Sequence, residues 1–463
     1  MSELSVATLP AELVSGAMPV EADQHAPPAA WWALGILCAV TLLRWIDQVV
    51  LVVGTESMRR SLGLTDTQLG MIQGLGIYLA AGIGAIPLGW LADRFDRLKV
   101  LALCILAWSA ATVWRAYVSS FGDLMSSTIG MAVADAALMP VSYALMPLLF
   151  RGRQLARANL ILYGASALGY SIAMVFAGGM FRTLQAHQAE LPHFLRGMEP
   201  WRSVSFIVGC VGPLSALLVL GIRTPSRPRR NPNFMPRVPK EPRASLRDHL
   251  ALHWRALAGI YGSALLVSIG IGPLLVWVGP AVARRFALDP SVVGAEVGTL
   301  FLLATILGMA ISALLEWIFG RKLGAMVSVR SAPALMLLCL FPLAWLGVAG
   351  TRTSLYGCVF LILLTLVSYN ASMPSIFQKV VPSSLRARMT ALGLAVLLVA
   401  NAGGPLLVGC ISDWLGSPNA LLASMALVGL PTTALGALLL WWAQPHVEST
   451  LAHCEEVDDR AEL

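Results

Sequence analysis

Charged residues are scarce in this chain of 463 residues: Asp, Glu, Lys and Arg make up 12% of it, against roughly a quarter in soluble domains. Hydrophobic residues reach 57%, and the mean hydropathy is +0.73. This composition excludes a large soluble domain and indicates a protein that crosses the membrane many times. The net charge of +7 comes from basic residues between the apolar runs, so we expect membrane lipids and no nucleic acid as partners.

Histidine and cysteine are also rare, with seven residues of each. All seven His lie outside the apolar runs, and the seven Cys are scattered without a C-x-x-C pair. We interpret the Cys as small packing residues. His249 and His253 lie four residues apart, and we expect them on a solvated face. Because no nucleophile elbow, Walker loop or H-E-x-x-H motif occurs, the sequence predicts no enzyme, no metal site and no cofactor other than a proton gradient.

Twelve apolar runs are long enough to cross a bilayer as helices, which takes about 20 residues. They predict an all-α membrane protein with twelve transmembrane helices in two bundles of six. The runs are 31–54, 68–91, 98–118, 123–149, 157–182, 201–222, 256–281, 293–317, 325–348, 354–376, 389–413 and 420–443.

A basic, proline-rich segment at residues 223–255 separates the runs six and six. The predicted organisation is an N-terminal tail (1–30) without a cleavable signal, a bundle (31–222), this central loop, a second bundle (256–443) and a C-terminal tail (444–463). With both termini in the cytoplasm, twenty-one Lys and Arg fall in cytoplasmic connections and eight in outer ones. The excess of basic residues favours this orientation, in the inner (plasma) membrane.

A short motif between the second and third runs, "GWLADRFDRLK", resembles the cytoplasmic loop signature of the major facilitator superfamily. Gly89, Asp93, Arg94 and Arg97 fit that signature, whereas Asp96 stands where Gly is usual. We predict a conformational latch: Gly89 lets two helices approach closely, and Asp93 pairs with a basic group of the other bundle. The alternative is a simple turn that follows the positive-inside rule.

Further segments extend the resemblance over most of the chain. "LLRWIDQ", "LGLTDTQLG", "GMAVADAALMP", "PWR" and "GPLLVGCISDWLG" are similar to the spinster-like and organic-anion symporter branches of the superfamily. The resemblance implies two six-helix bundles that alternate access to a central site. In these branches the first span carries Asp-Arg, and the fourth carries Arg followed seven residues later by Glu.

Two carboxyl residues lie near the middle of predicted spans, where charge is costly and usually functional. Asp47 keeps the first acid of the resemblance and Asp135 replaces its Glu, while Gln48 and Thr128 occupy the places of the two Arg. We predict that Asp47 and Asp135 couple transport to protons, with a fixed structural acid as the alternative for each. Arg44, one turn before Asp47, either neutralises it or points into the cavity to receive a substrate anion.

One more basic residue, Arg115, lies near the outer end of the third span, and we expect it to extend to the lipid headgroups. Further polar and aromatic residues at similar depth predict an amphiphilic cavity. The predicted substrate-binding residues are Arg44, Gln48, Gln73, Tyr78, Thr128, Tyr143, Tyr163, Tyr170, Trp277, Tyr369, Asn370 and Asn401.

The resemblance and the buried acids together predict a monomeric secondary active transporter that moves a small amphiphilic or anionic organic solute with protons. The loss of both usual Arg argues against a small dianion. Two alternatives stay open at this point: a transporter of lysolipids or sphingoid lipids, and a proton-driven efflux pump. Import or export, and symport or antiport, are equally compatible with the sequence.

Overall fold

The computed structural model describes residues 26–223, 246–324, 326–382, 385–417 and 419–462, and in these residues it contains helices and their connections but no strand. In those residues, twelve helical segments are long and apolar enough to cross a membrane. Each coincides with one of the twelve apolar runs to within a few residues at most ends. The predicted all-α architecture with twelve spans is therefore confirmed.

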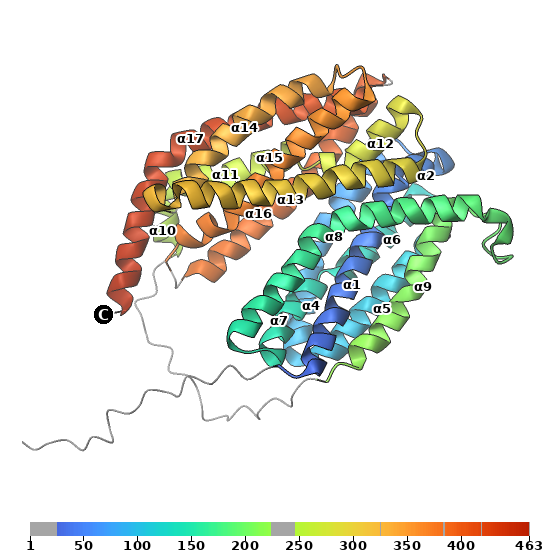
Figure 1. The fold of residues 1–463 in the computed structure, drawn as a ribbon, viewed down its shortest axis with the longest axis horizontal. Coiled ribbons are helices and arrows are strands. Elements are labelled where there is room, and N and C mark those ends of the chain that lie inside the picture. Colours follow the sequence, from blue (N-terminus) through green and yellow to red (C-terminus); the bar gives the residue numbers. More distant parts are fainter. Residues whose placement is uncertain (1–25, 224–245, 325, 383–384, 418, 463) are drawn as a thin grey trace, which may run out of the picture.

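The first half of the chain forms one bundle (Figure 1). Its fourth span is interrupted after Asp135, and its second contains a π-helical stretch, in which backbone hydrogen bonds join residues five apart. The elements are α1 (Pro28–Val53), α2 (Thr55–Leu62), α3 (Asp66–Met71), η2 (Ile72–Leu79), α4 (Ala80–Arg94), α5 (Arg97–Arg115), α6 (Phe121–Asp135), α7 (Leu138–Leu149), α8 (Gly152–Ala186), the short turn η3 (Gln188–Glu190) and α9 (Pro200–Leu220).

The second half forms the other bundle, preceded by a short helix. Its first span is broken near Pro273, which directly precedes α12 as its N-cap residue; proline cannot donate the backbone hydrogen bond that a continuous helix needs. The elements are α10 (Leu246–Leu252), α11 (Trp254–Gly270), α12 (Leu274–Phe286), α13 (Pro290–Leu323), α14 (Met326–Leu346), α15 (Arg352–Lys379), α16 (Arg386–Leu415) and α17 (Ala420–Glu462).

The two bundles converge near α2 and α12 and diverge toward the opposite ends of their helices (Figure 1). Glycines allow the close approach. A Cβ on Gly74 would lie 2.3 Å from the carbonyl oxygen of Ala402, and a Cβ on Gly178 would lie 3.0 Å from the Cα of Gly294. Side chains at these positions would separate the bundles, so backbone packing holds this end together.

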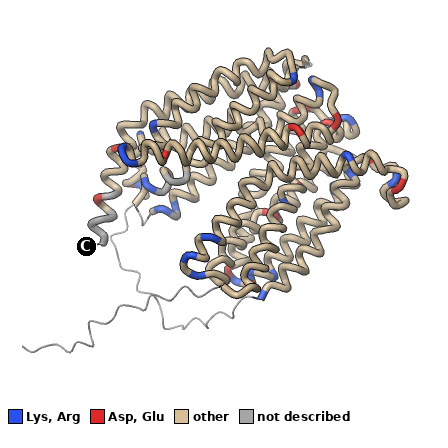
Figure 2. Tube along the Cα trace, viewed as in Figure 1, with Lys and Arg blue, Asp and Glu red and all other residues tan. Residues whose placement is uncertain are grey.

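Charged residues lie mainly near helix ends, and long middle stretches of the helices carry none (Figure 2). This distribution is what a bilayer demands, because an unpaired charge at its centre is costly. The predicted tails and central loop fall partly outside the described residues, at 1–25 and 224–245. The predicted C-terminal tail differs from the structure, since α17 continues through it as a helix to Glu462.

The histidines beside the second bundle correct a further prediction. His249 lies in α10 and is 7% exposed, not on a solvated face. Its ring lies 4.8 Å from that of His253, which lies 5.1 Å from the ring of His453 on α17. His253 also contacts the Thr450 hydroxyl at 3.0 Å. The polar end of α17 therefore packs against α10 and the start of α11.

Candidate functional site

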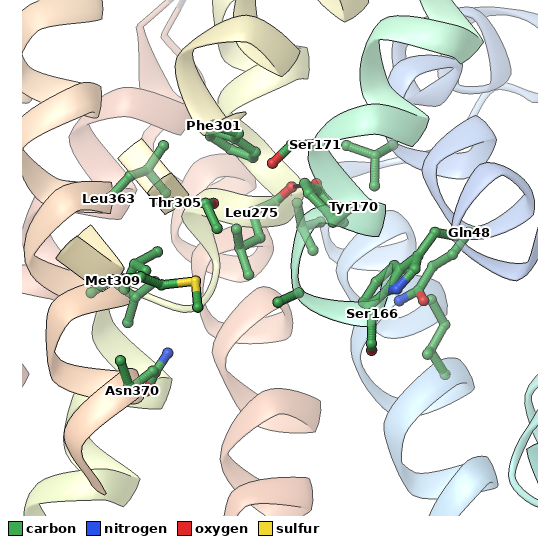
Figure 3. Close-up of a pocket in the computed structure, with 18 of the residues that line it drawn as sticks. Gln48, Ser166, Tyr170, Ser171, Leu275, Phe301, Thr305, Met309, Leu363 and Asn370 are labelled. Carbon is green, nitrogen blue, oxygen red and sulfur yellow. Dashed lines mark hydrogen bonds between the residues drawn. The ribbon is translucent and has the colours of Figure 1, made fainter. Parts of the chain in front are cut away.

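A cavity of about 360 Å³ lies between the two bundles. Figure 3 shows α1 and α8 on one side of it and α13 and α15 on the other, with Gln48 and Tyr170 facing Thr305 and Met309. Both halves therefore build it. The residues that line it are Trp45, Gln48, Val52, Gln73, Ile77, Tyr78, Tyr163, Ser166, Ala167, Tyr170, Ser171, Leu275, Val276, Phe301, Thr305, Met309, Leu363, Leu366, Val367, Asn370 and Ala371.

An aromatic wall crosses from one bundle to the other inside this cavity. Trp45 and Tyr170 meet edge to face with ring centroids 5.6 Å apart, and Tyr170 stacks on Phe301 at 5.5 Å. Trp45 fits there because Gly169 has no side chain: a Cβ would lie 2.3 Å from the indole. The Tyr170 hydroxyl donates to the backbone carbonyl of Leu275. This wall is a flat apolar surface, since the Tyr170 hydroxyl is already hydrogen-bonded to the backbone.

A few polar side chains also line the cavity, among them Gln73 and Asn370. Gln73 is 2% exposed and donates from Nε2 to the Thr55 hydroxyl at 3.0 Å, which leaves its Oε1 buried without a hydrogen-bond partner among the described residues. Asn370 lies across the cavity on α15 and is exposed within it. Buried acceptors normally have donors, so Gln73 is suited to accept a hydrogen bond from a bound solute.

An ion pair borders a small side pocket next to the main cavity. Arg44 Nη1 lies 2.9 Å from Asp135 Oδ2, with side-chain exposures of 15% and 20%. The guanidinium also lies 4.2 Å from the centre of the Trp45 ring, a favourable cation–π contact. Gln48 lines both the side pocket and the main cavity. Arg44 Nε and Asp135 Oδ1 have no partner among the described residues, so each retains capacity to bind another group.

Asp47 is engaged elsewhere, which corrects two predictions. It accepts hydrogen bonds from Trp108 Nε1 at 2.7 Å and from the Thr112 hydroxyl at 3.1 Å, and it pairs with Arg115. Asp47 is 0% and Arg115 1% exposed. Arg115 therefore does not extend to the headgroups, and Arg44 does not neutralise Asp47. Asp47 pairs with Arg115 of α5, whereas the side chain of Arg44 points to Asp135 of α6.

Six of the predicted substrate-binding residues line the main cavity: Gln48, Gln73, Tyr78, Tyr163, Tyr170 and Asn370. Arg44 lines the adjacent side pocket.

The other predicted substrate-binding residues do not line the cavity: Thr128, Tyr143, Trp277, Tyr369 and Asn401. Trp277 is 0% exposed and donates to the carbonyl of Pro405 at 3.0 Å. Tyr369 is 2% exposed, with its hydroxyl 3.4 Å from that of Ser263. The Thr128 hydroxyl donates to a carbonyl one turn earlier in α6. The polar groups of Trp277, Tyr369 and Thr128 are satisfied within the protein, so these three side chains do not face the cavity in this conformation. Tyr143 and Asn401 lie outside the cavity lining.

The motif around Gly89 lies at the end where the bundles diverge (Figure 1). A Cβ on Gly89 would meet nothing within 4 Å, so no close helix contact exists there in this conformation. Asp93 is exposed and has no ion pair among the described residues, Arg94 stacks on a Trp ring, and Arg97 donates to the carbonyl of Ala144 at 2.9 Å. The predicted latch is not engaged in this conformation.

Asp96, which departs from the family signature, has a structural role. Its carboxylate accepts a hydrogen bond from the backbone N–H of Leu98 at 2.9 Å and so caps the start of α5. An N-cap aspartate satisfies a backbone donor that the helix cannot pair itself. Asp96, although it replaces the usual Gly of the signature, therefore stabilises the first turn of α5.

An inter-bundle ion cluster, which the sequence did not predict, closes the opposite end. Arg284 of α12 contacts Glu56 at 2.6 Å and both carboxylate oxygens of Asp66 at 2.7 and 2.5 Å. The Ser412 hydroxyl donates to Asp66 at 2.6 Å. Asp413 accepts from the backbone N–H of Asp66 at 3.0 Å. Glu56 and Asp66 are 8% and 4% exposed, so charge pairing between the halves seals this end.

Residues 36–405 match the family model of the Major Facilitator Superfamily, and the chain belongs to that superfamily. It is a multi-pass membrane transporter and not an enzyme, as predicted.

Full-length relatives and a solved structure agree with this family. The chain is 26% identical to an MFS-type efflux pump of Mycolicibacterium smegmatis, covering 91% of this chain and 94% of that protein. It is 25% identical to a probable 4-methylmuconolactone transporter of Cupriavidus pinatubonensis, covering 82% of each. A bacterial homologue of the human lysosomal transporter spinster, inward-facing and unoccupied, superposes with a TM-score of 0.73 at 19% identity, covering 93% of this chain and 99% of that one. The predicted resemblance to the superfamily and its spinster-like members is confirmed by the family model, together with a match to the protein spinster of Drosophila melanogaster at 21% identity.

Proposed function

We propose that this protein is a proton symporter for an amphiphilic organic anion with an aromatic or similarly flat apolar body. The observation that carries the proposal is the position of the Arg44–Asp135 pair beside a cavity walled by Trp45, Tyr170 and Phe301. The aromatic wall would hold the apolar body, and Arg44 would bind the anionic group. One full-length relative, the probable 4-methylmuconolactone transporter, is named for the transport of an organic solute.

Solute and proton binding would be coupled because Asp135 and the solute carboxylate share one cation, Arg44. In the empty site Arg44 compensates Asp135 at 2.9 Å. A solute carboxylate that binds Arg44 weakens that pair, and Asp135 is left in a partly buried site where an unpaired charge is costly. Binding a proton removes that cost. Solute and proton therefore bind together, which is symport.

Access is then set by the inter-bundle ion cluster. The basic loops favour a cytoplasmic position for the end where the bundles diverge, so the sealed end would face outward and the structure would represent an inward-facing state. Movement of the bundles about the cavity would break the Arg284 contacts and close the Gly89 end. This is the alternating access that two-bundle transporters use.

Reconstituted proteoliposomes with an imposed inward proton gradient test the proposal. The probes are radiolabelled phenylacetate and 4-hydroxybenzoate, with benzylamine as a cation of similar size. Wild type should accumulate one or both carboxylates. Asp135→Asn should abolish gradient-driven accumulation and retain carboxylate exchange between the two sides. Arg44→Gln should abolish both activities, because the anion loses its partner.

The matched control is Glu190→Gln, which removes an exposed carboxylate outside the cavity and should behave as wild type. Gradient-driven accumulation by Asp135→Asn at the wild-type rate would refute the coupling role of Asp135. Proton-driven export of benzylamine would refute anion symport and favour proton-driven efflux, since one relative is named an efflux pump.

A further inference from the structure

A second cavity lies on the outer side of the second bundle, away from the solute site. It occupies about 420 Å³ between α14 and α17. Its lining residues fall on one face of each helix, at intervals of three and four residues, as a continuous groove along two packed helices requires. The lining is Arg330, Pro333, Ala334 and Leu337 from α14, and Ala437, Leu438, Trp441 and Gln444 from α17.

The groove opens toward the lipid. Leu337, Leu438 and Trp441 in its wall are 53%, 52% and 65% exposed, and both helices are membrane-spanning segments. Apolar side chains that are exposed in such segments face acyl chains. The groove exists because Ala334 and Ala437 have small side chains, which do not fill the space between the two helices. A lipid chain is the flexible apolar group present at this surface.

A cation stands at one end of the groove. Arg330 lies in the second turn of α14, near the basic pair Arg321 and Lys322. Its side chain is 45% exposed, and its ion pair among the described residues is with Glu448 at 3.4 Å, itself 61% exposed. An exposed pair at that distance contributes little stability. Arg330 can therefore turn to a phosphate, which its planar group binds through two parallel hydrogen bonds.

We propose that this groove binds one anionic phospholipid, with the phosphate on Arg330 and one acyl chain along Ala334, Leu337 and Ala437. The indole of Trp441 would lie against the upper part of that chain, where its apolar ring and its N–H suit the border between headgroup and hydrocarbon. The site requires both an anionic head at Arg330 and open space at Ala334. Those two requirements separate it from general attraction between anionic lipid and a basic surface.

Native mass spectrometry of the delipidated full-length chain, titrated with phosphatidylglycerol or phosphatidylcholine, measures this binding. Wild type should bind one phosphatidylglycerol more tightly than it binds phosphatidylcholine. Arg330→Gln should weaken phosphatidylglycerol binding about tenfold, the loss of one charge-assisted contact, and Arg330→Lys should restore part of it. Ala334→Phe should weaken binding by a similar factor with Arg330 intact, because the ring fills the groove.

Two matched variants serve as controls. Arg321→Gln removes an exposed charge at the same end of the bundle, and Leu338→Phe adds a ring on the same helix outside the groove; both should bind as wild type does. Equal losses in Arg330→Gln and Arg321→Gln would overturn the site in favour of diffuse attraction. Unchanged binding by Ala334→Phe, or equal affinity for the two lipids, would also overturn it. A single elution peak and unchanged helical content establish that each variant is folded.

Discussion

Replacement of Arg284 by Gln removes the guanidinium that pairs with two carboxylates of the other bundle, Glu56 and Asp66. Loss of one partner from a buried ion pair costs about 3–5 kcal/mol. Arg59, 3.5 Å from Asp66, and Arg60, 3.3 Å from Glu56, are partly exposed and remain. They offset part of the loss, so we expect a cost of about 2 kcal/mol. That corresponds to about a 30-fold shift away from the conformation described here.

Electron–electron distance measurements across the sealed end test this shift. Spin labels at Ser61 and Asp289, both exposed and on opposite bundles, report the separation, in a background where the exposed Cys210 and Cys410 are Ser. Arg284→Gln should transfer population from the short to a longer distance.

The control is Arg285→Gln, the exposed neighbouring arginine, which makes no ion pair among the described residues. Arg285→Gln should leave the distances as in wild type. If Arg284→Gln also leaves the short distance fully populated, the inter-bundle ion cluster does not hold this end closed.

Three further outcomes are expected. Arg115→Met should lower the free energy of unfolding by about 3–5 kcal/mol, because Asp47 is left buried and unpaired; adding Asp47→Leu should restore most of the thermal stability, and failure to do so would refute the pairing. Gly74→Val should lengthen the distance across the sealed end, since its Cβ would meet a carbonyl 2.3 Å away, whereas Gly164→Val, which meets nothing within 4 Å, should not. Burial lowers the pKa of His249 below its ordinary value of about 6.5. Below about pH 6.5 the unfolded chain binds a proton at His249 that the folded chain does not, so thermal stability should fall as the pH decreases from 6.5 and should not change through this group above 6.5. His249→Gln should reduce that fall.

The spans were predictable because a bilayer imposes a length on every helix that crosses it. Runs such as 201–222 and 123–149 coincide closely with α9 and with α6 plus α7, since a long apolar run has no other way to satisfy its backbone. The interruption after Asp135 and the extension of α17 were not predictable in this way. Both depend on neighbours: the end of α17 packs against His253, which is distant in sequence.

The candidate site was predictable only as a set of polar residues at the right depth. Gln48 and Tyr170 face the cavity, whereas Trp277 and Tyr369 point into packed protein. Depth along a helix follows from residue number, but the direction of a side chain depends on how the helix is rotated against its neighbours. The pairing of Asp47 with Arg115 rather than with Arg44 is decided by the same rotation.

The ion cluster was missed for a different reason. Glu56 and Arg284 lie between predicted spans, in outer connections for which the sequence predicted no contact. One signal was present: the outer connection of the first half carries two acids, Glu56 and Asp66, beside its own Arg59 and Arg60, and that of the second half carries the pair Arg284 and Arg285. Opposite charges at the same membrane level in two halves of a transporter are candidates for a gate.

The π-helical stretch η2 determines which groups the second span presents to the cavity. Gln73 and Tyr78 both line the cavity although they are five residues apart, a spacing that would place them on different sides of an ordinary α-helix. The wider turn of η2 brings them onto one side. Deletion of a single residue within 72–79 would tighten that turn and rotate one of the two side chains by roughly 100°. The lining of this cavity is thus sensitive to chain length at one point, and insertions or deletions there offer evolution a direct way to change its shape.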